Sequence, residues 1–185
     1  MGAMHSIKSA IGKALRPARS SDSHLAIHKL GATPRLSFSS SAFPQGGPIP
    51  RRYAKDGENF SPPLSWGELP AGTLALALLC EDPDAPMPQP FVHWVVCCVP
   101  PTTTHVSEGV SELTPRFVQG KNSFGSRRYD GPAPPPGHGV HHYHFQLFAL
   151  DRELTLGDTP DRGDLVDAMR GHVIAAGDVV GTYER

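Results

Sequence analysis

Prolines and glycines interrupt this sequence so often that no long helix can run through its body. The chain has 20 prolines and 19 glycines in 185 residues, and each proline removes a backbone donor and bends or breaks a helix interior. Hydrophobic residues make up 38% of the chain, which is enough for one core, while the length is too short for two ordinary domains. We therefore expect one mainly β domain whose strands are joined by long turns.

Strand-like segments alternate with these turns. They are apolar runs, rich in valine and aromatic residues, that are bounded by turn-forming residues. Four such runs are Leu74 to Cys80, Phe91 to Val99, His141 to Leu150 and Val179 to Tyr183. Residues 36–65 are polar and rich in proline and glycine, so they predict short edge strands and loops.

Helical spacing of apolar residues occurs twice, from Ile7 to Leu15 and from Asp164 to Ala176, where Gly177 would end the helix. The first helix would belong to an N-terminal extension, residues 1–34, that begins with an expression remnant, and residues 35–185 would form the domain. The extension is basic, so a membrane-surface or transit-peptide segment is an alternative. Its narrow apolar face without Trp or Phe favours packing on the domain or on a partner subunit, and we expect a homodimer.

Charge and cysteine content exclude several classes of protein. A net charge of −1 without a basic stripe argues against nucleic-acid binding, and no window reaches the roughly 18 apolar residues of a membrane span. Cys80, Cys97 and Cys98 are an odd set whose last two members could close only a strained ring, so we expect a reducing cytoplasm. All three lie in apolar strands, where a thiolate is disfavoured.

Two short segments place polar side chains next to buried strands. In Asp82-Pro83-Asp84-Ala85-Pro86 two prolines fix the backbone around two acids, although an ordinary turn would have the same composition. His93 lies in a strand that is apolar on both faces, where an unpaired ring would cost roughly 1–3 kcal/mol. A single buried histidine is more often structural than a ligand.

A third segment, Arg128 to Tyr143, leads into a cluster of histidines. Strand alternation puts His141 and Tyr143 on one face and His142 and His144 on the other, and no zinc-type spacing is present, so we expect neither a metal nor another cofactor. No nucleophile motif occurs. The enzyme alternative is a hydrolase or metal-dependent catalyst that uses Asp82, His93 and His141.

Taken together, these segments resemble the phosphatidylethanolamine-binding protein family, in particular its bacterial and archaeal Raf-kinase-inhibitor-like branch. The resemblance runs from about Leu36 to the C-terminus. It rests on Ser61 to Trp66, Asp82 to Pro86, His93-Trp94, Gly131 to Gly139, His141 to Phe145, Ala149 to Asp151 and Gly181 to Arg185. Two departures are Ala133, where bacterial relatives often carry Cys, and Ser123, where an acid is common.

The resemblance implies an antiparallel Greek-key β-sandwich with one or two peripheral helices and a ligand pocket at one end. The implied ligand-binding residues are Asp82, Asp84, His93, Pro134, Pro135, Gly137, His141, Tyr143 and Tyr183. Family members bind phosphate-like groups there, including phosphoethanolamine, and several inhibit kinases or proteases. A small phosphate-bearing ligand and a kinase or protease are therefore the expected partners, and no catalytic residue is expected.

The chemistry of these residues is consistent with an anion site. Two charged imidazoles would offer N–H donors, backbone N–H groups near Gly137 could approach closely, and the prolines would keep the wall rigid. Asp82 would repel a bare anion, but it could orient a histidine or bind the ammonium group of a zwitterion. If His93 and His141 are both cationic, anion binding weakens as the pH rises through their titration range.

Overall fold

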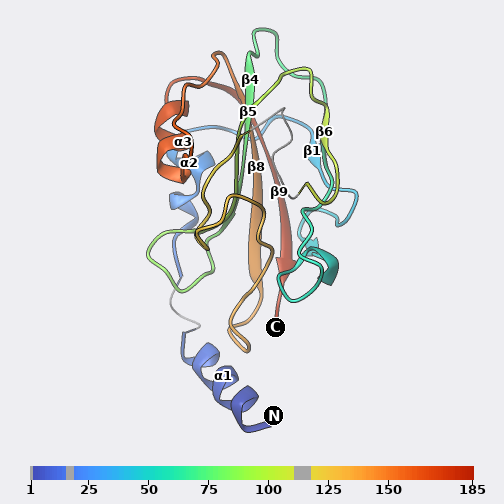
Figure 1. Ribbon diagram of the computed structural model, residues 1–185, viewed down its shortest axis with the longest axis vertical. Helices are drawn as coiled ribbons and strands as arrows, with labels where there is room; N and C mark the ends of the chain where they lie inside the picture. The colour runs from blue at the N-terminus through green and yellow to red at the C-terminus, as the bar shows by residue number, and fades with distance from the viewer. Residues whose placement is uncertain (1, 16–18, 111–117) are drawn as a thin grey trace.

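The computed structural model describes residues 2–15, 19–110 and 118–185, and in these ranges two β-sheets form a sandwich (Figure 1). The larger sheet contains, in spatial order, β2 (Gly47–Pro48), β9 (Val173–Tyr183), β8 (His141–Leu150), β4 (Ala75–Asp82), β5 (Phe91–Val99) and β7 (Val118–Gln119). The smaller sheet contains β1 (Phe38–Ser39), β3 (Leu64–Trp66) and β6 (His105–Val106). All pairs of neighbouring strands are antiparallel except β2 and β9.

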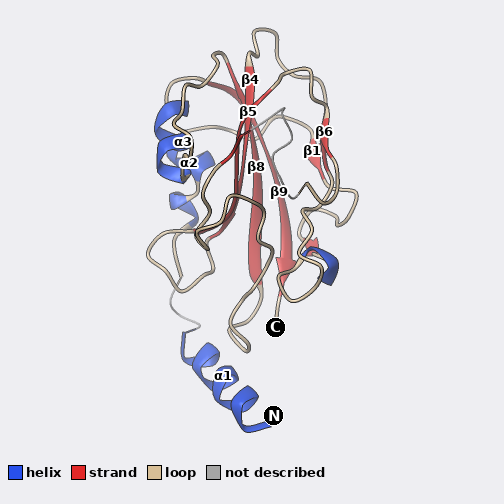
Figure 2. Cartoon of the chain, in the orientation of Figure 1, coloured by secondary structure: helices blue, strands red, loops and turns tan. Residues whose placement is uncertain are grey.

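Helices α2 (Ala26–Lys29) and α3 (Arg162–Met169) cover one face of the larger sheet, and the smaller sheet covers the other (Figure 2). The α-helices are α1 (Gly2–Leu15), α2 (Ala26–Lys29) and α3 (Arg162–Met169), and two 3-10 turns are η1 (Asp22–His24) and η2 (Arg51–Tyr53). Because β4 lies between two covered faces, every one of its residues is buried. The expected mainly β fold is confirmed, whereas its Greek-key connections stay a prediction.

Side-chain alternation along β4 divides the interior into two cores. Leu76, Leu78 and Cys80 point to the core shared with the smaller sheet. Ala75, Ala77 and Leu79 point to the core under the helices, which also contains Leu165 of α3. The predicted strands Phe91 to Val99 and His141 to Leu150 have the bounds of β5 and β8, and the strand expected at Leu74 begins one residue later and continues to Asp82.

The prediction for the C-terminal region was wrong about where helix gives way to strand. Helix α3 ends at Met169, and β9 already begins at Val173. Gly171 has φ +75°, a left-handed conformation that stops the helix there. From Val173 onward the chain pairs with β8, and Gly177 lies inside the strand, where a Cβ atom would meet the Phe38 side chain at 2.6 Å.

A buried polar network fastens α2 and α3 to the sheet. Glu81, which is fully buried, accepts hydrogen bonds from the Ala26 backbone N–H at 2.8 Å and from Gln146 Nε2 at 2.6 Å. Arg162 of α3 completes the network with an ion pair to the same carboxylate. Leu25 beside it is fully buried, so part of the segment that the sequence assigns to the extension packs into the second core.

Helix α1 lies beyond one end of the sandwich, next to the loop that precedes β8 and near the C-terminus (Figure 1). The helix predicted from Ile7 to Leu15 is confirmed. It contacts its own chain, and the expected homodimer stays a prediction. Among the described helices, none is long and apolar enough to cross a membrane.

Candidate ligand-binding site

A cavity of about 250 Å³ opens at the end of the larger sheet where β4 finishes and β5 and β8 begin. These three strands are neighbours in the sheet, and each contributes one polar side chain to the cavity: Asp82, His93 and His141. The remaining lining residues are apolar: Ala85, Pro86, Met87, Phe91, Phe124, Ala133, Pro134 and Pro135. The site is therefore a small apolar cavity with a polar floor.

Asp82 organises the turn that follows β4 as well as the floor of the cavity. Its Oδ1 atom accepts hydrogen bonds from the backbone N–H groups of Asp84 at 2.9 Å and Ala85 at 3.2 Å. Its Oδ2 atom lies 2.8 Å from His141 Nδ1. Residues 82–86 thus form a turn that is held by the Asp82 side chain, and the Asp82 carboxylate also belongs to the site.

His141 has protein partners at both ring nitrogens. Nδ1 faces Asp82, and Nε2 lies 2.6 Å from Nδ1 of His138. His138 in turn faces the backbone oxygen of Leu15 in α1, at 2.9 Å from Nε2. His138 was not among the predicted site residues. Its partner Leu15 is 123 residues away in the sequence, and a turn separates it from its other partner, His141.

His93 is held by the backbone of the loop before β8. Its Nδ1 atom lies 2.6 Å from the carbonyl oxygen of Asp130 and must donate, since a carbonyl only accepts. Burial lowers the pKa of His93 and outweighs the opposing effect of Asp82. His93 is therefore neutral near pH 7 and keeps Nε2 as an acceptor, so the condition of two cationic imidazoles is not met.

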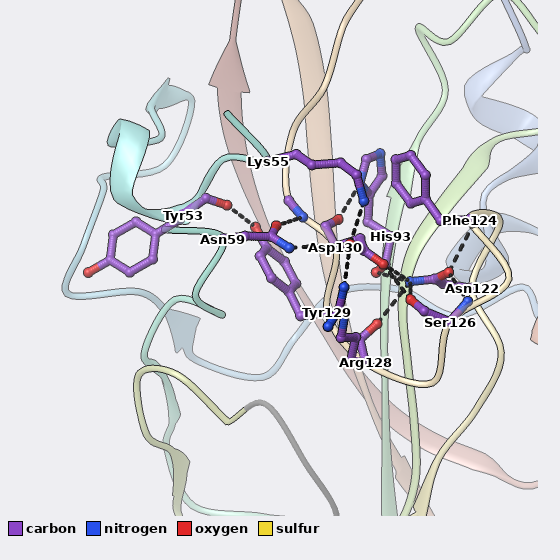
Figure 3. A network of polar contacts seen from close by, with 11 residues as sticks. Tyr53, Lys55, Asn59, His93, Asn122, Phe124, Ser126, Arg128, Tyr129 and Asp130 are labelled. Carbon is purple, nitrogen blue, oxygen red and sulfur yellow. Dashed lines mark hydrogen bonds and ion pairs between the residues drawn. The ribbon is translucent and has the colours of Figure 1, made fainter. Parts of the chain in front are cut away.

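A network of polar side chains around Asp130 supports the wall next to His93 (Figure 3). The Asp130 carboxylate accepts hydrogen bonds from Lys55 Nζ at 2.5 Å and from Asn122 Nδ2 at 3.0 Å, as well as one from Ser126. Burial disfavours the charged form, but these bonds outweigh it and lower the pKa of Asp130 to about 2. Lys55 Nζ also lies 3.9 Å from the ring centroid of Phe124, which lines the cavity.

Five of the nine predicted ligand-binding residues line the cavity: Asp82, His93, Pro134, Pro135 and His141. Asp84 instead accepts hydrogen bonds from His142, at 2.9 Å from the backbone N–H and 2.7 Å from Nδ1. Tyr143 lies behind the floor, with its ring centroid 5.1 Å from that of His93. Its hydroxyl is buried, which raises the pKa of Tyr143 well above the ordinary value.

Gly137 and Tyr183 also lie outside the cavity lining. Gly137 has φ +78° in the loop before β8 and donates its N–H to the carbonyl oxygen of Arg185 at 2.8 Å. Tyr183 donates its hydroxyl to Asp56 at 2.8 Å. Both residues therefore fix segments next to the site.

The apolar walls include residues that sequence analysis did not select. Met87 at the mouth is 51% exposed, and Phe91 and Phe124 meet edge to face with ring centroids 4.8 Å apart. Their position depends on how distant loops meet, which strand periodicity cannot predict. Ala133, noted above as a departure from the family pattern, lies in the wall itself.

The fold and the cavity define a class of β-sandwich with a ligand-binding pocket at one end. Residues 39–184 match the family model of the phosphatidylethanolamine-binding protein. A UPF0098 protein of Methanothermobacter thermautotrophicus is 43% identical over 153 residues, which cover 81% of this chain and 99% of the relative. The chain belongs to the phosphatidylethanolamine-binding protein family, as its sequence motifs indicated.

Solved structures agree with this assignment. A structure from Chlamydia trachomatis, described as that of a phosphatidylethanolamine-binding protein homologue, has a TM-score of 0.75 and 35% identity, covering 83% of this chain and 99% of that one. The E. coli protein YbcL, described as a member of the mammalian family, has a TM-score of 0.74 and 29% identity, covering 81% and 98%.

Proposed function

We propose that the pocket binds a small phosphate-bearing ligand of the phosphoethanolamine type. The observation that carries this proposal is the convergence of Asp82, His93 and His141, from three neighbouring strands, on the floor of an otherwise apolar cavity. A few convergent polar groups in an apolar cavity are typical of sites for small molecules. The predicted residues outside the lining would act by holding the surrounding loops.

The size of the cavity limits the ligand. Its volume of about 250 Å³ is below the roughly 300–1,000 Å³ that is typical of small-molecule pockets. A head group fits this space, whereas the acyl chains of a complete lipid do not. The exposed mouth at Met87 would let a longer substituent extend outward.

The hydrogen-bonding character of the floor favours a ligand that brings its own protons. The Asp82 carboxylate and Nε2 of neutral His93 are both acceptors. A fully ionised phosphate offers only acceptors, so its oxygens would face these atoms unfavourably. An ammonium group or a protonated phosphate oxygen supplies the missing donor, and phosphoethanolamine can supply both.

The enzyme alternative is not favoured by this geometry. Both ring nitrogens of His141 are engaged, by Asp82 and by His138, so neither is available as a metal ligand or a general base. Within the described ranges, no three His, Cys, Asp or Glu side chains are arranged to hold a metal ion. Regulation of a kinase or a protease and a cytoplasmic location stay predictions of the sequence analysis.

Calorimetric titration with phosphoethanolamine tests the proposal. Met87→Glu would place a negative charge at the mouth of the pocket, and we expect it to weaken binding several-fold. Leu74→Glu is the matched control, because Leu74 is 52% exposed but precedes the opposite end of β4. Binding that is equal in the two variants, or absent in the wild type, would contradict the proposed site.

A further inference from the structure

Two described parts of the N-terminal extension, residues 9–15 and 19–20, contact the two loops that hold the pocket. Helix α1 packs on the loop before β8: a Cβ atom at Gly12 would meet the Pro136 oxygen at 2.1 Å, and one at Gly137 would meet Ser9 Oγ at 2.7 Å. This close approach requires glycine on both sides of the contact. The helix is thus fitted to the loop that carries His138.

The same extension also contacts the turn that follows β4. The Ser20 backbone N–H donates to the Pro83 oxygen at 2.9 Å. Arg19 forms an ion pair with Asp84 at 3.3 Å. The described parts of the extension therefore contact the loop before β8 and the turn after β4, which adjoin the strand ends that carry His141 and Asp82.

A chain of three hydrogen bonds connects α1 to that floor. It runs from Asp82 Oδ2 to His141, from His141 Nε2 to His138 Nδ1, and from His138 Nε2 to the Leu15 oxygen. The Leu15 carbonyl at one end can only accept, and the Asp82 carboxyl group at the other end donates only when it is protonated. Every bond in the chain must therefore receive its hydrogen from within the Asp82, His138 and His141 set.

A chain with all three hydrogen bonds formed requires one additional proton. An ionised Asp82 and two neutral imidazoles contain two N–H groups, but three hydrogen bonds need three. The third hydrogen makes one histidine cationic or the carboxyl group neutral, and the set then carries no net charge. Without the Leu15 oxygen, two hydrogens satisfy the remaining bonds, and the set carries one negative charge.

We propose that α1 is a proton-linked latch on the pocket, with His138 as the positioning residue that joins the helix to His141. Docking of the Leu15 oxygen is accompanied by uptake of one proton, so acidification favours docking and docking favours the protonated set. Because His141 lines the cavity, removal of one negative charge from the floor favours an anion. Only this last consequence rests on the function proposed above.

Other ionisable groups lie around the chain. Those that face or flank it are Cys80, Asp84, His93, His142, Tyr143, Arg19, Arg185 and, on α1 itself, Lys13. Burial raises the pKa of Cys80 and Tyr143 and lowers that of His93, so these three groups are neutral near pH 7. Burial opposes the charge of Asp84, but hydrogen bonds from His142 lower its pKa, and the carboxylate pairs with Arg19.

Ligand-free protein tests the latch by NMR titration of the histidine ring nitrogens. In Gly12→Leu the helix cannot seat against Pro136, and we expect the additional proton on His138 and His141 to leave at a pH lower by roughly half a unit or more, as loss of one hydrogen bond implies. Ala10→Leu is the matched control, since Ala10 is exposed on the same helix. It should titrate as the wild type does.

His138→Asn provides a second route to the same result. The asparagine amide can still reach His141 but is too short to reach Leu15. The substitution should therefore remove the additional proton, and it tests the latch even if the Gly12 variant fails to fold. Inorganic phosphate added afterwards should bind several-fold more weakly to Gly12→Leu than to Ala10→Leu. Identical proton release in all variants would overturn the latch, whereas altered release without phosphate binding would overturn only the proposed function.

Discussion

Cys97 and Cys98 are neighbours in β5, yet both side chains pack against the core under the helices. Regular strands send consecutive side chains to opposite faces. Here the pairing between β4 and β5 shifts opposite these cysteines, and Cys98 has φ +58°, which is characteristic of a β-bulge. The neighbouring Cys97 thiol lowers the pKa of Cys98 to about 7.

This bulge predicts that Cys98 reacts first with a thiol-alkylating reagent. The expectation that all three cysteines disfavour the thiolate is wrong at Cys98, which is also the only partly exposed member of the set. At pH 7 we expect iodoacetamide to modify Cys98 well before Cys80, whose pKa is raised by burial. Peptide mass spectrometry over time measures this order, and Cys97→Ala should slow modification of Cys98. Equal rates at Cys80 and Cys98 would contradict the prediction.

Asp130 should make the protein sensitive to acid. Its pKa of about 2 lies below the value of an unfolded aspartate, so its stabilising contribution is complete above pH 4 or so and is lost as the pH falls through the folded value. Asp130→Asn should lower the free energy of unfolding by roughly 1–3 kcal/mol at pH 7 and by less at pH 3. Urea denaturation measures both values. Asp158→Asn, an exposed position, is the control, and a similar loss in both variants would argue against the network.

His144 should stabilise the fold in the opposite pH range. Burial opposes its charge, but the Asp178 carboxylate, 3.0 Å from Nδ1, raises the pKa of His144 above its ordinary value. The resulting stabilisation is complete below the unfolded value near 6.5 and is lost as the pH rises through the folded value. His144→Asn should therefore lower the free energy of unfolding by about 1 kcal/mol at pH 5.5. At pH 9 its effect should be almost the same as that of His28→Asn, a control at an exposed position. Equal losses at both pH values would exclude the charged pair.

Local periodicity predicted the parts of this molecule that depend on local spacing. The bounds of β5 and β8 follow from apolar runs, and the placement of His141 inside and His142 outside follows from strand alternation. The predicted boundary between α3 and β9 was wrong, because the apolar residues from Val173 to Ala176 fit helical spacing as well as strand pairing. In that case pairing with β8 decided the outcome.

Long-range contacts explain what the sequence could not show at the site. Lys55 and Phe124 meet across a loop junction, and His138 meets Leu15 over a separation of 123 residues. No spacing rule connects such positions. Family motifs identified the residues on strand ends, but the apolar wall and the contact with α1 required the structure.

If the pocket face of β8 carries the binding chemistry, calorimetry with phosphoethanolamine at pH 6 will separate the two faces of this strand. His141→Ala breaks the chain between Asp82 and His138, and we expect it to lower affinity about tenfold or more, equivalent to about 1.4 kcal/mol. His142→Ala, whose ring is exposed and faces Asp84, should change affinity by less than about twofold, well under 1 kcal/mol. A tenfold loss in the first variant alone would support ligand binding at the pocket face of β8. Equal losses in both variants, or no loss in His141→Ala, would contradict it.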